Sequence, residues 1–416
     1  MSGALPGSAR DAAGPVDPVG LVDPVDLAVD LIRIDSTNPD LVPGAAGETA
    51  VAAHAAAWLR ARGFDVRILE DVPGRPTVLA TSRGTGGGRT ILLDGHLDTV
   101  PPGDPERGGL SPRIEDGRLL GRGAFDMKAG LAAAMVAADR ARRIGTRGDV
   151  VLALVADEEF GSIGTEEALR ALAADGTRID GAVISEPSQS EAIVAHRGFG
   201  WYEIRVRGRA AHGSMPEQGV DAIAHAGLVL RELDALRDRL EAGPRHPLLG
   251  TGAVRVSRIH GGTDAATVAD ACVLTVERRF LPGQGTADVE AELRAALDRV
   301  VARTPGMDAE LEPLVARAAF EADVDGPLAR AVLDSGARVT GAPVPHRGEP
   351  FWTDAGLVQE AGIPCILLGV TGGGAHAAEE WAEVASIRSL ADVLEGAILD
   401  FCGRADAPVE RAAPSA

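Results

Sequence analysis

Histidine and carboxylate side chains follow four apolar segments of this 416-residue chain, at positions where neither residue type packs well. The four segments are "TILLD" (90–94), "DVVLALVA" (149–156), "GAVIS" (181–185) and "PCILLGV" (364–370). The polar residues after them are His96 and Asp98, then Asp157, Glu158 and Glu159, then Glu186, and finally His376 after a run of glycines. A further candidate, Asp126, follows the glycine-rich turn of "GRGAFDMKAG". Ligands of open α/β sheets bind at the carboxyl ends of the strands, so we expect these side chains to converge there.

Each of these residues also has a structural explanation when it is considered alone. Asp126 could be a helix N-cap, and the acids at 157–159 could form the first turn of a helix, where the helix dipole favours them. His96 with Asp98 could be a hydrogen-bonded surface pair, and His376 could be a solvated loop residue. All of these explanations would have to hold at once, however. Two histidines and several carboxylates at one sheet edge would be mutually repulsive without a cation, so we expect a divalent metal there.

The mixture of ligand types indicates two ions. One histidine with carboxylates at each of two sites, bridged by a shared carboxylate, gives mixed nitrogen and oxygen ligation that suits zinc, with cobalt or manganese as alternatives. Asp98 follows His96 at the spacing needed to accept the other imidazole N–H. Of the adjacent acids Glu158 and Glu159, one can bind metal while the other stays available as a base.

The elements that must position these residues predict an α/β fold, with a mixed, mostly parallel sheet and helices on both faces. The apolar segments are continuous, as in strands covered on both faces, and helical stretches such as "DMKAGLAAAMVAADRARR" lie between them. Between about 198 and 315, strands such as "GWYEIRVRG" alternate, which predicts an inserted α+β unit with one open sheet face. We expect a disordered leader (1–24), a metal-binding α/β domain (25–197 and 316–405), an inserted α+β unit (198–315) and a tail (406–416).

Charge and cysteine content limit the partners and the compartment. Arg and Lys total 41 against 61 Asp and Glu, and the formal net charge of -20 disfavours nucleic acid and membrane as partners. Cys272, Cys365 and Cys402 have no paired or zinc-finger spacing, so we expect no disulfides and a reducing, cytoplasmic location. The N-terminal segment lacks the pattern of a signal peptide, and no apolar run approaches the roughly 20 residues that span a bilayer.

Several motifs together resemble those of a known family. In order and spacing, "GHLDTVP", "GRGAFDMKAG", "ADEEFGS", "SEPS", "RAAHGSMPEQGVDAI" and "AHAAEEW" are similar to motifs of the co-catalytic zinc amidohydrolases. That family includes acetylornithine deacetylase, succinyl-diaminopimelate desuccinylase, aminoacylases and glutamate carboxypeptidases, and the resemblance runs from about residue 25 to 400. It implies a two-zinc centre and a lid that also forms a homodimer. The metal ligands that it implies are His96, Asp126, Glu159, Glu186 and His376, with Asp126 bridging both ions.

The resemblance also implies roles for residues that do not bind metal. Asp98 resembles the residue that orients the first histidine, and Glu158 resembles the general base. His212, in "AAHGS", resembles a histidine that reaches the active site of a partner subunit and steadies the oxyanion, although it could be only a turn residue. Arg279, in "ERRFLPG", resembles an arginine that holds a substrate carboxylate, although the adjacent Arg278 could be the one that faces the site.

Two departures from the family pattern concern the substrate more than the chemistry. Ala266 stands where the family usually has an asparagine that contacts substrate, and alanine cannot form that hydrogen bond. The loop "GVTGGGAH" before His376 lacks the usual Gly-Pro-Gly. We therefore leave the side chain and the acyl group of the substrate open.

These features predict an amidohydrolase that uses metal-activated water to cleave the amide bond of N-acyl amino acids. A glutamate at position 186 is similar to the deacylases and carboxypeptidases of the family, whereas its aminopeptidases and dipeptidases more often have aspartate. The alternatives are a carboxypeptidase or dipeptidase, acting on short peptides, and a non-catalytic metal-binding homologue. The last alternative would be expected to lack Glu158 or a metal ligand, and neither is missing.

Overall fold

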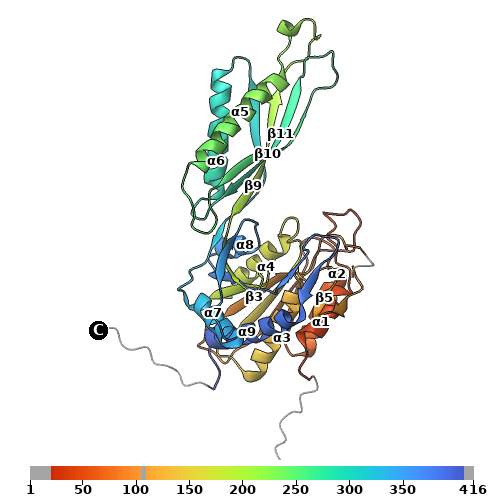
Figure 1. The fold of residues 1–416 in the computed structure, drawn as a ribbon, viewed down its shortest axis with the longest axis vertical. Helices are drawn as coiled ribbons and strands as arrows, with labels where there is room; N and C mark the ends of the chain where they lie inside the picture. Colours follow the sequence, from red (N-terminus) through yellow and green to blue (C-terminus); the bar gives the residue numbers. More distant parts are fainter. Residues whose placement is uncertain (1–19, 105–108, 407–416) are drawn as a thin grey trace, which may run out of the picture.

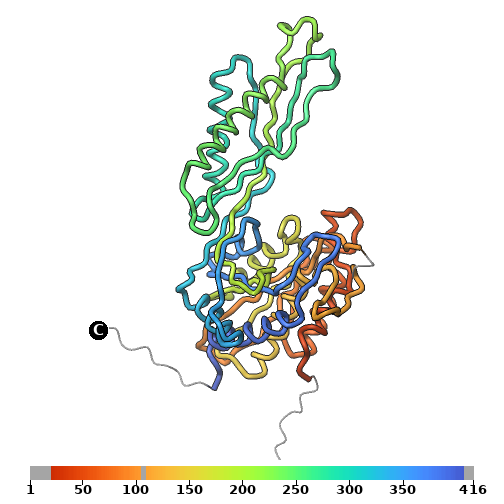
Figure 2. The backbone as a smooth tube through the Cα atoms, viewed as in Figure 1, coloured from red at the N-terminus to blue at the C-terminus, as the bar shows by residue number. Residues whose placement is uncertain are grey.

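The computed structural model describes residues 20–104 and 109–406. The expected leader and tail fall almost entirely on 1–19 and 407–416, which lie outside the described residues, and the first helix begins at Pro24. The molecule is elongated, because a smaller unit projects from one end of a larger α/β unit (Figure 1). Figure 2 shows the chain running into the smaller unit and back again, as expected for an insertion.

The large unit is built on a mixed nine-stranded sheet. Parallel pairing joins its four central strands, β6, β3, β7 and β15, and antiparallel pairs extend the sheet on either side of them. This arrangement confirms the predicted mixed α/β fold. In spatial order the strands are β1 (Asp65–Leu69), β2 (Thr77–Ser82), β6 (Val150–Val155), β3 (Ile91–His96), β7 (Gly181–Ile184), β15 (Cys365–Leu367), β8 (Ala192–His196) and β13 (Phe320–Glu321), with β14 (His346–Glu349) pairing with β8.

Helices cover both faces of this sheet, which explains why the strand sequences are continuously apolar. Ile91 and Leu93 of β3 pack into the core on one face, whereas Leu92 packs into the core on the other. The first face carries α1 (Pro24–Ile32), α2 (Thr49–Ala61), α3 (Lys128–Ile144), α7 (Pro327–Thr340) and α9 (Val384–Cys402). The second face carries α4 (Ile163–Ala174) and α8 (Ala355–Glu360).

The smaller unit has its own antiparallel sheet and its own core. Alternate residues of its strands, such as Tyr202, Ile204 and Val206, are buried beneath two helices, which cover one face of the sheet (Figure 1). In spatial order the strands are β10 (Ala253–Gly261), β11 (Ala271–Phe280), β9 (Gly198–Arg207) and β12 (Asp308–Arg317). The helices are α5 (Ala222–Glu241) and α6 (Thr286–Arg303), with a 3-10 turn, η2 (Pro216–Gln218), before α5.

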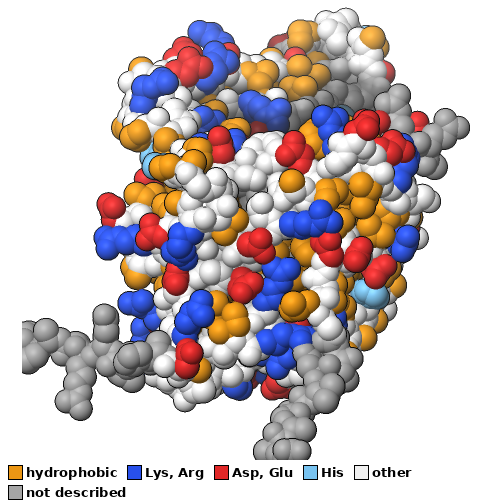
Figure 3. Space-filling view, turned by 60° about the horizontal axis from the view of Figure 1, so that its bottom comes forward, with side chains coloured by type: hydrophobic (Ala, Val, Ile, Leu, Met, Phe, Trp, Pro, Cys, Tyr) orange, Lys and Arg blue, Asp and Glu red, His pale blue; other side chains and the backbone are white. Residues whose placement is uncertain are grey.

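The described residues also form a third, smaller sheet of four strands. The small sheet brings a C-terminal hairpin beside a hairpin from the first third of the chain; its strands are β16 (Gly372–Gly373), β17 (Trp381–Glu383), β5 (Arg118–Leu120) and β4 (Arg113–Glu115). The three cysteines are buried and form no disulfide. On the face in Figure 3, basic and acidic side chains are interspersed. No helix in the ranges 20–104 and 109–406 is long and apolar enough to cross a bilayer.

Candidate metal centre

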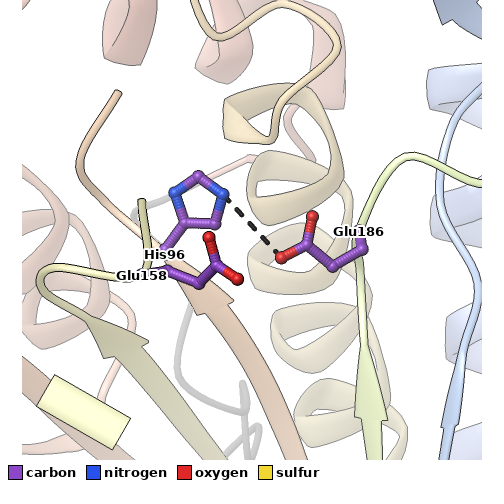
Figure 4. Close-up of side chains that lie close together, drawn as sticks. All are labelled: His96, Glu158 and Glu186. Carbon is purple, nitrogen blue, oxygen red and sulfur yellow. Dashed lines mark ion pairs between the residues drawn. The ribbon is translucent and has the colours of Figure 1, made fainter. Parts of the chain in front are cut away.

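The carboxyl ends of three neighbouring strands bring the candidate ligands together. His96 is the last residue of β3, Glu158 and Glu159 follow β6, and Glu186 follows β7. Because β6 and β7 both pair in parallel with β3, their ends lie at the same edge of the sheet. His96, Glu158 and Glu186 point toward one another there, as Figure 4 shows. The convergence expected from the sequence is therefore present.

Two groups of side chains at this edge have the spacing of metal ligands. His96, Glu158 and Glu186 each offer a ligand atom, and these atoms lie within 4.8 Å of one another; the same holds for His96, Asp126 and Glu159. The Nε2 atom of His96 lies 3.2 Å from Asp126 Oδ1 and 3.8 Å from Glu186 Oε1. Asp126 is not the helix N-cap, because α3 begins at Lys128 and its N-cap is Met127.

His376 reaches the same cluster from a loop after β15. Its Nε2 atom lies 3.0 Å from Glu159 Oε2 and 3.6 Å from Asp126 Oδ2, so Asp126 lies between the two histidines. The loop turns at Gly374, whose φ is +77°, and a Cβ there would lie 1.9 Å from the carbonyl oxygen of Glu379. The glycine run before His376 therefore permits a backbone path that a side chain would block.

Glu380, which the sequence interpretation did not identify, holds the turn that carries Asp126. Its Oε1 atom accepts hydrogen bonds from the backbone N–H groups of Phe125 (2.8 Å) and Asp126 (2.9 Å). Its Oε2 atom accepts from the N–H of Gly123 (3.0 Å) and from Arg122 Nη1 (2.6 Å). Since Glu380 lies four residues after His376, one short segment presents a histidine to the centre and fixes the loop of the central carboxylate.

Asp98 and Asp157 anchor the acidic turn after β6. The Asp98 carboxylate accepts the backbone N–H groups of Glu158 (3.1 Å) and Glu159 (3.2 Å). The His96 Nδ1 atom lies 2.9 Å from the backbone oxygen of Asp98 and 3.7 Å from its Oδ1, so the contact with His96 is made by the carbonyl. Asn38, a second residue that the sequence interpretation missed, donates to the carboxylates of both Asp98 (2.8 Å) and Asp157 (3.0 Å). The acids at 157–159 thus form an anchored turn rather than the first turn of α4.

Burial dominates the electrostatics of the carboxylates in this cluster. Burial, together with the charge of Glu186, raises the pKa of Glu158 well above its usual value. Burial also raises the pKa of Glu186 and of Glu159. Burial opposes ionisation of Asp126 as well, but hydrogen bonds from His376 and His96 hold its pKa below the usual range. A divalent cation would stabilise the ionised form of every one of these carboxylates.

These residues fit a divalent metal centre. The donor set combines two imidazoles with carboxylates, which is the ligation that zinc, cobalt and manganese accept. Within the described residues, the buried Oε1 atom of Glu159 has no hydrogen-bond partner, although Glu159 belongs to one of the ligand groups. An unpaired buried carboxylate oxygen is costly unless it binds a cation, so the site is built to hold an ion.

A cavity of about 720 Å³ extends from this centre toward the smaller unit. Glu158, Glu159 and His376 line it at one end, and Arg279 of β11 lines it at the other. The neighbouring Arg278 points the opposite way, because its side chain is fully buried and donates to Glu292 of α6 at 2.9 Å. Of the two adjacent arginines, Arg279 is therefore the one that faces the cavity.

His212 and Ala266 lie elsewhere in the smaller unit. Neither residue lines the cavity, and both are exposed. The Nδ1 atom of His212 accepts from Ser214, and the carbonyl oxygen of Ala266 accepts from Gly213 N at 2.6 Å, so these two segments run side by side. In this structure, therefore, His212 does not border the cavity beside the metal centre.

Comparisons with known proteins identify the class. Residues 92–400 match the family described as peptidase family M20/M25/M40, and the chain belongs to this family. It is 31% identical over 409 residues to succinyl-diaminopimelate desuccinylase of Parvibaculum lavamentivorans, covering 95% of this chain and 99% of the relative. It is 29% identical to acetylornithine deacetylase of Myxococcus xanthus, covering 84% and 91%. The fold resembles the crystal structure of aminopeptidase PepT from Bacillus cereus, with a TM-score of 0.74 at 21% identity over 91% of this chain and 98% of the other. The protein is thus a metal-dependent hydrolase of amide bonds.

Proposed function

We propose that this protein is a deacylase that cleaves N-acyl amino acids at a centre of two divalent ions, most suitably zinc. The observation that carries the proposal is the cluster of His96, His376 and four buried or half-buried carboxylates at one end of a cavity. His96, Asp126 and Glu186 would hold one ion, and Asp126, Glu159 and His376 the other. Glu158 also lies within ligand distance of His96 and Glu186, and we assign it instead the role of the base, which the family resemblance implies.

The ions, when bound, lower the pKa of a water molecule and polarise the amide carbonyl. Glu158 takes a proton from the attacking water as the new C–O bond forms, and it gives that proton to the leaving nitrogen as the C–N bond breaks. The backbone of Glu158 is fixed by Asp98, so its carboxylate is positioned before substrate arrives. The bound ions would favour the ionised form of Glu158, which is the form that can accept a proton.

The smaller unit supplies the remaining groups as a lid. Arg279 donates from Nε and Nη2 to Glu277 Oε1, and in the described part of the chain its Nη1 atom has no hydrogen-bond partner. A guanidinium with a free N–H in the cavity suits the carboxylate of an amino acid. His212 would serve the centre of a second subunit and steady the oxyanion, with the lid sheet forming a homodimer interface.

Metal removal and a substrate panel test this function. Exhaustive dialysis against a chelator should abolish release of free amine from N-acetyl amino acids, and added Zn²⁺, Co²⁺ or Mn²⁺ should restore it. The chain should stay folded by circular dichroism, since the core of the large unit is made of apolar side chains and includes none of the ligands. Dipeptides in the same panel separate a deacylase from a peptidase. Full activity at a verified metal content of zero would end the proposal, and faster cleavage of dipeptides than of any N-acyl amino acid would replace it with the peptidase alternative.

A further inference from the structure

Aromatic side chains are concentrated in the cavity beside the metal centre. The chain has eight Phe and four Trp residues, and half of these twelve line this one cavity. Several of them are open to solvent: Phe160 is 53% exposed, Phe351 42% and Trp201 37%. Exposed rings grouped in a cavity indicate an apolar ligand. The six residues are Phe125, Phe160, Phe199, Trp201, Phe351 and Trp352.

The strand register places two of these rings on the open face of the lid sheet. In β9 the even-numbered residues from Tyr202 onward pack under the helices, so Phe199 and Trp201 lie on the opposite face. Phe199 stands between Arg279 of β11 and Arg317 of β12. Trp201 stands between Glu277 and Val315 in the next cross-strand row. The uncovered face at this end of the lid sheet therefore carries two aromatic side chains, with arginine side chains beside them.

Trp352 of the large unit completes this surface. Its ring centroid lies 5.6 Å from that of Phe199 in an edge-on arrangement, and Phe199 lies 5.1 Å from Trp201. The indole N–H of Trp352 donates to the carbonyl oxygen of Ala318 at 2.9 Å, which fixes the orientation of the ring. The three residues Phe199, Trp201 and Trp352, called the aromatic shelf below, are therefore arranged before any ligand binds.

The charges around the shelf disfavour a cationic side chain. Arg279, Arg317 and Arg347 all line the cavity. The nearby carboxylates already form ion pairs with arginines. Glu277 pairs with Arg255 and Arg279, and Glu349 pairs with Arg347. An ammonium group placed on the shelf would meet guanidinium groups and no unengaged carboxylate among the described residues of that wall. Such a group would lose its hydration without compensation.

The position of Arg279 indicates which half of a substrate lies on the shelf. Its guanidinium carbon lies 5.2 Å from the Phe199 ring centroid. The carboxylate of an amino acid is attached to the same carbon as its side chain. If Arg279 binds that carboxylate, the side chain of the substrate lies against the neighbouring aromatic rings. The acyl group of the substrate lies on the other side of the scissile bond.

We propose that the shelf selects N-acyl amino acids with a large apolar, preferably aromatic, side chain in the amino-acid half. This inference rests on the proposed function and adds the substrate class to it. Burial of such a side chain contributes roughly tenfold to a hundredfold in kcat/KM over alanine. The preference differs from what the names of the relatives above describe, since ornithine and diaminopimelate carry charged groups.

A substrate series with metal-loaded protein tests the preference. We expect N-acetylphenylalanine and N-acetylleucine to exceed N-acetylalanine by about tenfold or more in kcat/KM, and to exceed N-acetylornithine by at least as much. N-benzoylglycine, with its ring in the acyl half, should be no better than N-acetylalanine. A preference for N-acetylornithine or for N-benzoylglycine would overturn this inference and leave the deacylase function standing. Failure to cleave any N-acyl amino acid would overturn both.

A variant pair connects the preference to the shelf. Trp201→Ala should lower the ratio of kcat/KM for N-acetylphenylalanine to that for N-acetylalanine by about tenfold, the contribution of an aromatic pair. Trp58→Ala is the matched control, because Trp58 is a half-buried tryptophan of α2 beside Arg62 and outside the cavity. Trp352→Ala, at the half-buried third residue of the shelf, gives a second measurement if Trp201→Ala is poorly folded. An unchanged ratio in both cavity variants would refute the assignment.

Discussion

The Glu380 carboxylate allows the Asp126 turn to be loosened without altering a proposed ligand or base. Its two oxygens accept three backbone N–H groups and one guanidinium N–H. In Glu380→Gln one oxygen becomes an NH₂ group that faces donors, and the charge opposite Arg122 is lost. The side chains of Glu380 and Arg122 are 2% and 4% exposed, so water cannot replace these contacts. Removing one partner of a buried pair costs about 3–5 kcal/mol, and we expect about 3 kcal/mol because the amide keeps one acceptor.

The same change should weaken metal binding. Loss of a residue that orients a metal ligand typically lowers affinity about 10–100-fold. We would measure unfolding of the metal-free variant by denaturant titration, and metal affinity by competition with a chromophoric chelator. Glu379→Gln is the control, since Glu379 is the adjacent glutamate and is exposed. Glu380→Gln with the stability and metal affinity of that control would refute our assignment of Glu380 as the anchor of Asp126.

Three further predictions concern other parts of the molecule. Mixing Glu158→Gln with His212→Ala under conditions of subunit exchange should restore activity toward a quarter of wild type, because half of the dimers are mixed and half of their sites are whole; no recovery despite proven exchange would mean that His212 does not act in a partner subunit. Burial lowers the pKa of His196 to about 4 in the folded chain, whereas an unfolded histidine has a pKa of about 6.5. Between these two pH values the imidazole is protonated only in the unfolded chain. The free energy of unfolding should therefore fall by up to about 3 kcal/mol as the pH drops from 6.5 to 4. His196→Gln should lose less stability over that interval in thermal melts, and an identical loss would contradict the pKa. Gly374→Ala should lower both metal affinity and turnover at least about tenfold, because the new methyl group would displace the loop of His376; wild-type values would show that the loop does not fix His376.

The site residues at the strand ends could be predicted from the sequence, because each follows directly after an apolar segment that predicts a strand. Continuous apolar segments followed by His96, Glu158 and Glu186 require only that the strands be parallel neighbours, which they are. The choice between Arg278 and Arg279 was also available, since alternation in "CVLTVERRF" places Arg278 on the face of Leu274 and Val276.

The anchoring residues could not be predicted in this way. Glu380 contacts a turn more than 250 positions earlier in the chain, and its neighbours give no period that distinguishes it from the exposed Glu379. Asn38 follows the first helix and reads as an ordinary turn residue before a proline, yet it joins Asp98 to Asp157. The role of such a residue depends on which loops meet in the folded chain. The residues next to it in the sequence do not indicate those contacts.

Glu158→Gln tests most directly the claim that Glu158 moves the proton at a divalent metal centre. The amide has the same shape but cannot accept a proton from water, so metal content should equal that of the wild type while kcat falls at least about a hundredfold. Metal would be measured by elemental analysis of the dialysed protein, and kcat by release of free amine from the best N-acyl amino acid of the panel. A variant with full metal content and near-normal kcat would contradict the assignment of Glu158 as the base.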